Sequence, residues 1–455
     1  LRLVGADWRR PITRLAESIT VIGLWFGAMN IAFDVGRIDR SPANLLKFGR
    51  FQSPLLWDVV AVSTYIMLAT ISLYVALIPD LAHMRDRTKS KSWRRLYSVL
   101  SLNWGGTKTQ WIRIEKALLI LAILVVPTMV LVHTVVSYVF SMSVQPMWHE
   151  SIFGPFFVAG ALHSGVALIL VIMYLLRRFY HLENLLTLRH FDNMGKLLIA
   201  MAFIWLYLTG AEHLTAYYGA EPAIMAALSD RVLGRFSPIW VFMMFANFVI
   251  PAGILLLRRT PGWTFIAGLS VVAGMWVERL LILIPTLENP RLPYAEAIYT
   301  PTWVEYGLVI GSLSFFALLY YLFTKFFPII PIWEVKREEE KALGMHNGGE
   351  SVDEAQVEEG GLPLLRDGSD KTVRIAQYAL LGFFLFAEFF VMGIILNGIR
   401  NGILFGIVNR EIADWASLGF SIGVNSVFLP IHIGTTYAVG RLAWFLIREG
   451  GEAEG

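Results

Sequence analysis

The sequence contains no cysteine among its 455 residues. The chain therefore forms no disulfide, and it has no thiolates to hold an iron–sulfur cluster or to attach haem c covalently. A metal redox centre would have to use the nine histidines or belong to a partner. Walker, GxGxxG, HExxH and nucleophile-elbow motifs are also absent from any credible structural context.

Charged residues are scarce as well. They make up 16% of the chain, whereas about a quarter of an ordinary soluble domain is charged. Hydrophobic residues make up 56%. This composition predicts an all-α, polytopic membrane helix bundle with the lipid bilayer as its surroundings. The net charge of +3 is small and the basic residues lie in loops, which fits membrane topology and indicates no nucleic-acid partner.

Apolar runs long enough to cross a hydrocarbon layer of about 30 Å predict ten transmembrane helices. They cover residues 14–36, 55–82, 113–140, 152–178, 195–219, 237–258, 263–286, 303–325, 373–398 and 416–446. The acidic, glycine-rich stretch 337–371 predicts a cytoplasmic linker that need not be ordered. It separates a main transmembrane domain, 1–336, from a C-terminal helix pair and tail, 372–455.

Lysine and arginine are unevenly distributed between the loops on the two sides of these spans. The loops on the side of the N-terminus hold far more of them than the loops on the opposite side. The positive-inside rule therefore predicts that both termini of this sequence are cytoplasmic.

With that orientation, titratable residues gather in the outer half of the bundle. They include Asp34, Asp58, His133, His163, Glu212, His213, Glu278 and Arg279. A charged group inside the bilayer costs a few kcal/mol unless it is paired, hydrated or used. Two interpretations remain open: the groups bind a quinol head group and accept its protons, or they are structural pairs such as Glu278 with Arg279. Their common depth favours function.

His133 and His163 lie on consecutive antiparallel spans at comparable depth, so they could ligate a b-type haem. The alternative is that each is a core histidine with its hydrogen bonds satisfied. We expect the second, and hence no metal or haem in this chain.

Several strings resemble one family of membrane proteins. They are SPLLWDVVAVSTY, LIPDLAHMRDR, LTLRHFDNMGK, GMWVERLLI, YTPTWVEYG and FPIIPIWEVK, in order between Trp8 and Lys336. The chain resembles the NrfD or polysulfide-reductase-type membrane subunits, and more closely ActC and ActF of bacterial alternative complex III. The resemblance implies a pair of four-helix bundles in the bacterial inner membrane and a site for menaquinol or another quinol near the outer face. It also implies a homologous NrfD-like membrane protein as partner, with electrons passing to periplasmic iron–sulfur and haem c proteins.

The quinol-binding pattern of that family is kept in part. Asp58 and Arg279 match it, whereas Asp34 replaces a histidine and Val139 replaces an aspartate. This departure resembles ActF more than ActC. The string ADWRRPITRLAESIT resembles the family sequence after its second helix, so we expect two family helices to be absent from this sequence.

The resemblance and the polar zone together give a set of expected roles. We expect Asp34, Asp58 and Arg279 to be catalytic, and Asp58, His133 and Arg279 to contact quinol. Proton transfer is assigned to His133, Glu212, His213 and Glu278. Two other functions remain open: a structural membrane anchor for extrinsic redox subunits, and a secondary ion transporter, although no convincing inverted repeat is present.

Overall fold

The computed structural model describes residues 2–34, 40, 53–291 and 298–335, and isolated positions between 430 and 441. Within these residues every regular element is a helix. The predicted linker, 337–371, and the predicted span 373–398 lie outside the described residues, as does the span 416–446 apart from those isolated positions.

Eight helical segments of the described chain are long and apolar enough to cross a bilayer, and they confirm the first eight predicted spans. They are α1 (Arg10–Asp34), α3 (Pro54–Arg87), α5 (Lys108–Ser141), α6 (Phe153–Phe179), α7 (Leu188–Gly219), the combined segment α9 (Ser237–Met244), η2 (Phe245–Val249) and α10 (Ile250–Leu257), α11 (Pro261–Glu288) and α12 (Trp303–Phe326). A short 3₁₀ helix, η1 (Asp7–Arg9), leads into α1. Two further helices, α4 (Lys91–Leu100) and α8 (Pro222–Val232), lie between spans.

The chain divides into two compact units. Unit 1 comprises residues 1–51, 62–128 and 318–455, and unit 2 comprises residues 52–61 and 129–317. Three of the four boundaries between the units fall inside helices, namely α3, α5 and α12.

Unit 1 contains a buried ion pair between its first two long helices. Arg14 on α1 is 1% exposed and places Nη1 3.0 Å from Oδ2 of Asp80 on α3. Its Nη2 also donates to the Ala76 carbonyl at 2.7 Å. Asp80 in turn accepts from the backbone N–H of Trp333. A buried arginine needs this many partners because an unpaired charge in a low-dielectric interior is very unfavourable.

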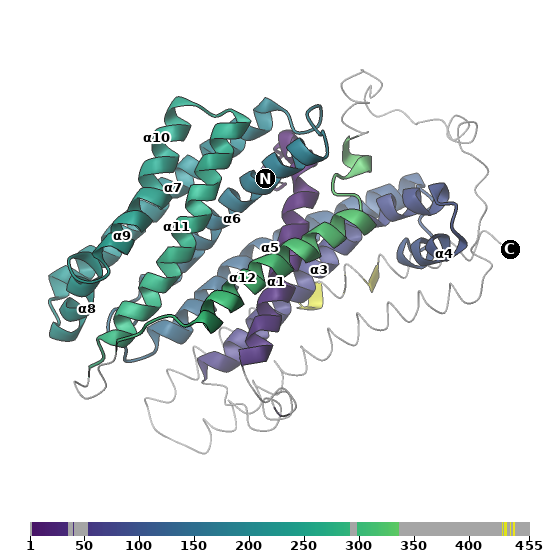
Figure 1. The fold of residues 1–455 in the computed structure, drawn as a ribbon. Helices are drawn as coiled ribbons and strands as arrows, with labels where there is room; N and C mark the ends of the chain where they lie inside the picture. Colours follow the sequence, from purple (N-terminus) through teal and green to yellow (C-terminus); the bar gives the residue numbers. More distant parts are fainter. Residues whose placement is uncertain are drawn as a thin grey trace, which may run out of the picture. The chain divides into compact units, whose positions relative to one another are not determined.

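Unit 2 is built on a four-helix bundle. Helices α6, α7, α10 and α11 contact one another in a closed ring, α6 with α7, α7 with α10, α10 with α11 and α11 with α6 (Figure 1). Glycines bring α11 close to α6: a Cβ at Gly268 would lie 2.9 Å from the Ala167 carbonyl oxygen. Small residues at such contacts are typical of helix packing in membranes, where close backbone approach provides much of the attraction.

The span between α9 and α10 is interrupted by the π-helical turn η2, which precedes Pro251. Proline has no N–H, so position 251 cannot donate to the carbonyl of residue 247 in an α pattern or of residue 246 in a π pattern. Both carbonyls have donors on neighbouring helices instead. Ser270 Oγ donates to Ala246 O at 2.9 Å, and His163 Nε2 lies 3.2 Å from Asn247 O. The irregular turn therefore ties this span to α6 and α11.

Candidate functional site

Non-spanning segments cover one end of unit 2, and we call this the α8 end. The loop 142–152 between α5 and α6, helix α8, and residues 289–291 after α11 all lie there, and α8 contacts α7, α9 and α11. His163 and Glu278 each lie about 15 Å along their helices from this end, and Glu212 about 10 Å, at 1.5 Å per residue. These three side chains therefore lie in the half of unit 2 nearer the α8 end.

The deeper group of polar residues, which we call the Glu278 cluster, consists of His163, Trp205, Asn247, Glu278 and Arg279. Glu278 is 3% exposed and accepts a 2.6 Å hydrogen bond on Oε1 from the Trp205 indole. The Trp205 ring stacks on His163, with 6.1 Å between ring centroids. The cluster therefore joins α6, α7, η2 and α11 through hydrogen bonds and one ring-stacking contact.

Several polar atoms of this cluster have no hydrogen-bond partner among the described residues. They are His163 Nδ1, both side-chain heteroatoms of Asn247, Glu278 Oε2 and Arg279 Nη1. Since His163 donates through Nε2, its Nδ1 carries a lone pair. Buried groups of this kind normally bond ordered water or a ligand, because leaving one unsatisfied costs about 1–3 kcal/mol.

Arg279 lies at the margin of this cluster. Its guanidinium carbon lies 4.4 Å from the Phe157 ring centroid, and Nη2 is 3.9 Å from Glu278 Oε2. That second distance is too long for a hydrogen bond. Gly160 leaves room for the guanidinium, because a Cβ there would lie 3.1 Å from Nη2. The side chain is 37% exposed, so Arg279 is held in place yet remains open to a ligand.

His133 and Asp58 are the other residues expected at a quinol site, and both belong to unit 2. His133 lies within electrostatic range of Arg279, and its Nδ1 donates to the Met129 carbonyl at 2.8 Å. Its Nε2 is therefore available as an acceptor. Asp58 Oδ1 is a buried atom without a hydrogen-bond partner in the described chain. The carboxylate and the imidazole can thus each accept a proton.

The second group, which we call the Glu212 cluster, consists of Glu150, Glu212, His213 and Arg231. Glu212 Oε1 is 2.9 Å from Arg231 Nη1, and Oε2 is 3.1 Å from His213 Nδ1. Trp240 donates its indole N–H to His213 Nε2 at 3.2 Å. A ring nitrogen that accepts cannot carry a proton, so this bond holds His213 neutral. Arg231 is therefore the cation that balances Glu212 in this cluster.

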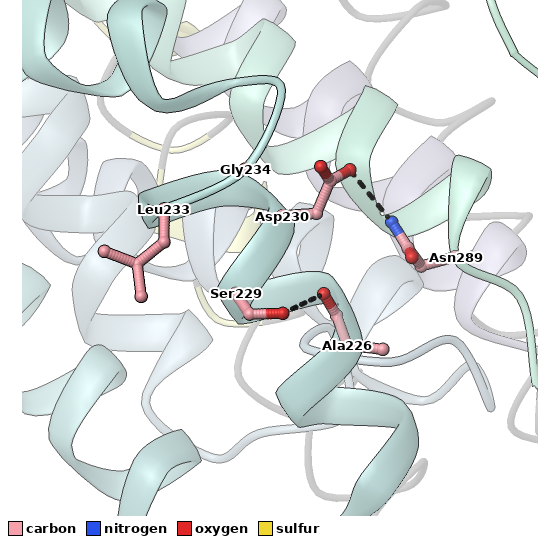
Figure 2. Close-up of a pocket in the computed structure, with 6 residues that line it drawn as sticks. All are labelled: Ala226, Ser229, Asp230, Leu233, Gly234 and Asn289. Atoms are coloured by element: carbon pink, nitrogen blue, oxygen red, sulfur yellow. Dashed lines mark hydrogen bonds between the residues drawn. The ribbon is translucent and has the colours of Figure 1, made fainter.

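A hollow on the surface of α8 is separate from both clusters. Figure 2 shows its lining, which is formed by Ala226, Ser229, Asp230, Leu233, Gly234 and Asn289. Asp230 Oδ2 accepts from the Asn289 amide at 3.2 Å, and its Oδ1 accepts from the Arg235 backbone N–H at 3.0 Å. Both oxygens of the Asp230 carboxylate therefore accept hydrogen bonds that stabilise the turn after α8.

Comparison with known proteins identifies the family. The family model described as "Polysulphide reductase, NrfD" matches residues 6–289, which is more than half of the chain. The chain belongs to the NrfD family.

Three curated relatives are similar along most of their length. A putative dimethyl sulfoxide reductase membrane subunit from Halobacterium salinarum is 26% identical over 65% of this chain and 70% of its own. The Hdr-like menaquinol oxidoreductase integral membrane subunit from Archaeoglobus fulgidus is 25% identical, over 71% and 77%. A selenate reductase subunit from Mesobacillus selenatarsenatis is 23% identical, over 73% and 80%. The chain is accordingly an NrfD-type integral membrane subunit.

The structure sorts the predicted residues of this NrfD-type chain into distinct places. Glu278 and Arg279 lie together in the deeper cluster, with His133 in electrostatic range of Arg279. Glu212 and His213 form part of the second cluster. The side chain of Asp34, at the end of α1, lies outside the described residues.

The site also contains four residues that the sequence analysis did not identify. Trp205 and Asn247 look like ordinary span residues, and Arg231 and Glu150 look like loop residues. Arg231 is in fact 3% exposed, because α8 packs against α7, α9 and α11. Pro251 was the available signal for Asn247, since a proline inside a span leaves carbonyls without donors.

No group of three or more histidine, aspartate or glutamate side chains in the described part of the chain is arranged to hold a metal ion. His163 engages Asn247 O through Nε2 and stacks on Trp205, so only its Nδ1 has a lone pair that could bind a metal.

Proposed function

We propose that this NrfD-type chain is the membrane subunit of a quinol-oxidising electron-transfer complex in the cytoplasmic membrane. The proposal is carried by one observation: Arg279 Nη1 and Asp58 Oδ1, in the same unit, are buried polar atoms without hydrogen-bond partners in the described chain. Such atoms suit a ligand with a polar head group and an apolar tail. The relative named as a menaquinol oxidoreductase subunit supports menaquinol as the ligand.

The proposed roles follow from donor and acceptor chemistry. Arg279 donates to a quinol oxygen and stabilises the negative charge that develops when that oxygen loses its proton. Asp58 and His133 Nε2 accept the hydroxyl protons. Glu278, Glu212 and His213 then belong to the route by which protons leave, with His213 taking part only if its bond to Trp240 opens. Asp34 is retained as a catalytic candidate from the sequence alone.

The electrons require partners, because this cysteine-free chain has no thiolate for an iron–sulfur cluster. We propose periplasmic iron–sulfur and haem c proteins as acceptors, with a homologous NrfD-like chain beside this one in the membrane. An arrangement of the alternative complex III type, with this chain nearer ActF than ActC and both termini of the sequence cytoplasmic, fits the motif resemblance and the distribution of basic residues.

The test is quinol turnover of the intact complex with Arg279→Gln or Asp58→Asn. Loss of a hydrogen bond to a charged group, about 1.5–3 kcal/mol, corresponds to a fall of roughly 10- to 100-fold in kcat/KM. Arg178→Gln is the matched control, because Arg178 is an exposed arginine in the last turn of α6. Normal turnover in both site variants would exclude these residues from the reaction.

A structural anchor is the second candidate function, and the Glu212 pair favours it. Arg231 and His213 contact both oxygens of the Glu212 carboxylate, so this carboxylate has its partners without a bound substrate. An anchor predicts that Arg279→Gln and Asp58→Asn leave the turnover of every assembled complex unchanged and alter only the yield of assembly. Measuring turnover per assembled complex, with subunit stoichiometry determined on the same sample, separates the two functions.

A further inference from the structure

The loop 142–152 closes the α8 end of unit 2 and is firmly attached there. Met147 is fully buried against Ala216 on α7 and Leu228 on α8. Trp148 donates its indole N–H to the Ile282 carbonyl on α11 at 2.8 Å. The backbone N–H of Glu150 donates to Trp148 O at 2.8 Å. Glu150 is therefore held in one position by a loop that contacts three helices.

Glu150 supplies the second carboxyl group of the Glu212 cluster. It is within electrostatic range of Glu212 and His213 on α7 and of Arg231 on α8. The preceding residue, His149, has its Nε2 3.9 Å from Glu221 Oε2, and both of these side chains are partly exposed. Glu150 Oε2 is a buried atom with no hydrogen-bond partner among the described residues.

The charges of this cluster do not balance when both carboxyls are ionised. Arg231 supplies one positive charge and is already 2.9 Å from Glu212. His213 is neutral because Trp240 donates to its Nε2. An ionised Glu150 would therefore be an additional negative charge in a place of low dielectric constant. Its unpartnered Oε2 is the place where a proton removes that charge.

We propose that Glu150 is a proton-binding carboxyl at the α8 end of unit 2, which takes up a proton released inside the unit and returns it to the aqueous phase. The first part stands on the geometry of the Glu212 cluster; the second rests on the proposed quinol oxidation. When a quinol is oxidised, its two O–H bonds break, two protons leave, and two electrons pass to the redox subunits. Glu150 accepts a proton and no electron.

The environment of Glu150 sets the range in which it exchanges a proton. Burial, and next the negative charge of Glu212, raise the pKa of the Glu150 carboxyl to about 7, against the opposing charge of Arg231. A carboxyl that is half protonated near neutral pH both accepts and releases protons readily.

Infrared difference spectroscopy of the whole complex tests the binding of the proton. We expect protonated-carboxyl absorption that titrates near neutral pH in the wild type, loses amplitude in Glu150→Gln, and keeps its full amplitude in Glu183→Gln. Glu183 is an exposed glutamate in the α6–α7 connection and serves as the matched control. An unchanged amplitude in Glu150→Gln, or the absence of any near-neutral band in the wild type, would overturn the inference.

Proton release measured with a pH indicator during a single turnover tests the pathway. Removing a group that transfers a proton slows such a step by at least ~10-fold, so Glu150→Gln should delay proton release relative to electron transfer. Unchanged release kinetics would refute the role of Glu150 in the pathway. Because the infrared titration needs no quinol, it distinguishes failure of this inference from failure of the proposed function.

Discussion

Gly274 on α11 is the position at which the structure makes its sharpest prediction about packing. A Cβ at Gly274 would lie 2.8 Å from the Cβ of Ala246 and would also overlap Oδ1 of Asn247. Both neighbours are buried in η2, and Ser270 on α11 bonds the Ala246 carbonyl. Neither helix can move away without breaking that bond. Overpacking costs about 1–3 kcal/mol, and the better helix propensity of alanine offsets at most about 1 kcal/mol. Gly274→Ala should therefore destabilise the protein by about 1–2 kcal/mol.

Gly253 on α10 is the matched control, because a Cβ there meets nothing within 4 Å. Gly253→Ala should stabilise the protein by about 0.4–1 kcal/mol, so the two substitutions have opposite signs. The assay is thermal unfolding of the purified complex in one detergent, read by fluorescence. If Gly274→Ala is as stable as Gly253→Ala, then η2 does not pack against α11 as described.

Three further substitutions probe the two clusters. Arg231→Met leaves Glu212 without its cation and should lower stability by about 3–5 kcal/mol, and adding Glu212→Gln should recover most of the loss; a double variant as unstable as the single would contradict the pairing. Trp205→Phe removes the donor to Glu278 Oε1 and should cost about 1–3 kcal/mol in thermal unfolding, whereas an unchanged melting temperature would exclude that bond. The pKa of Glu150 in the folded protein, about 7, exceeds the ordinary pKa of a glutamate. The wild type therefore loses stability as the pH rises from that ordinary pKa through 7. Glu150→Gln should match the wild type near about pH 4 and exceed it by about 1–2 kcal/mol near about pH 9, a figure reduced for partial solvent exposure; equal stability at both values would contradict the raised pKa.

The first eight spans could be predicted from the sequence because the bilayer leaves few choices. A helix satisfies its own backbone groups, and its length must match the hydrocarbon thickness. Apolar runs such as that of α3 therefore gave the helices within a few residues, as they did for α11. The positions of Glu278 and Glu212 along their helices followed from the same counting, since residue number fixes the distance from a helix end.

The partners of these residues could not be predicted in the same way. Arg231 looked like a loop cation because its burial depends on how α8 packs, which no local pattern reveals. The π-helical turn at Asn247 depends on His163 and Ser270, which lie on other helices. The neutral state of His213 depends on Trp240, 27 residues away. Tertiary contacts, and not composition, decide which buried polar groups are paired and which remain available.

Photoaffinity labelling of the intact complex with a light-activated quinone analogue tests the central proposal most directly. We expect the label in unit 2 of this chain, on peptides containing Asp58 or Arg279, with competition by unmodified quinol and loss of labelling in Arg279→Gln. Arg178→Gln should label as the wild type does. Labelling confined to other subunits, with none on this chain, would contradict a quinol site here.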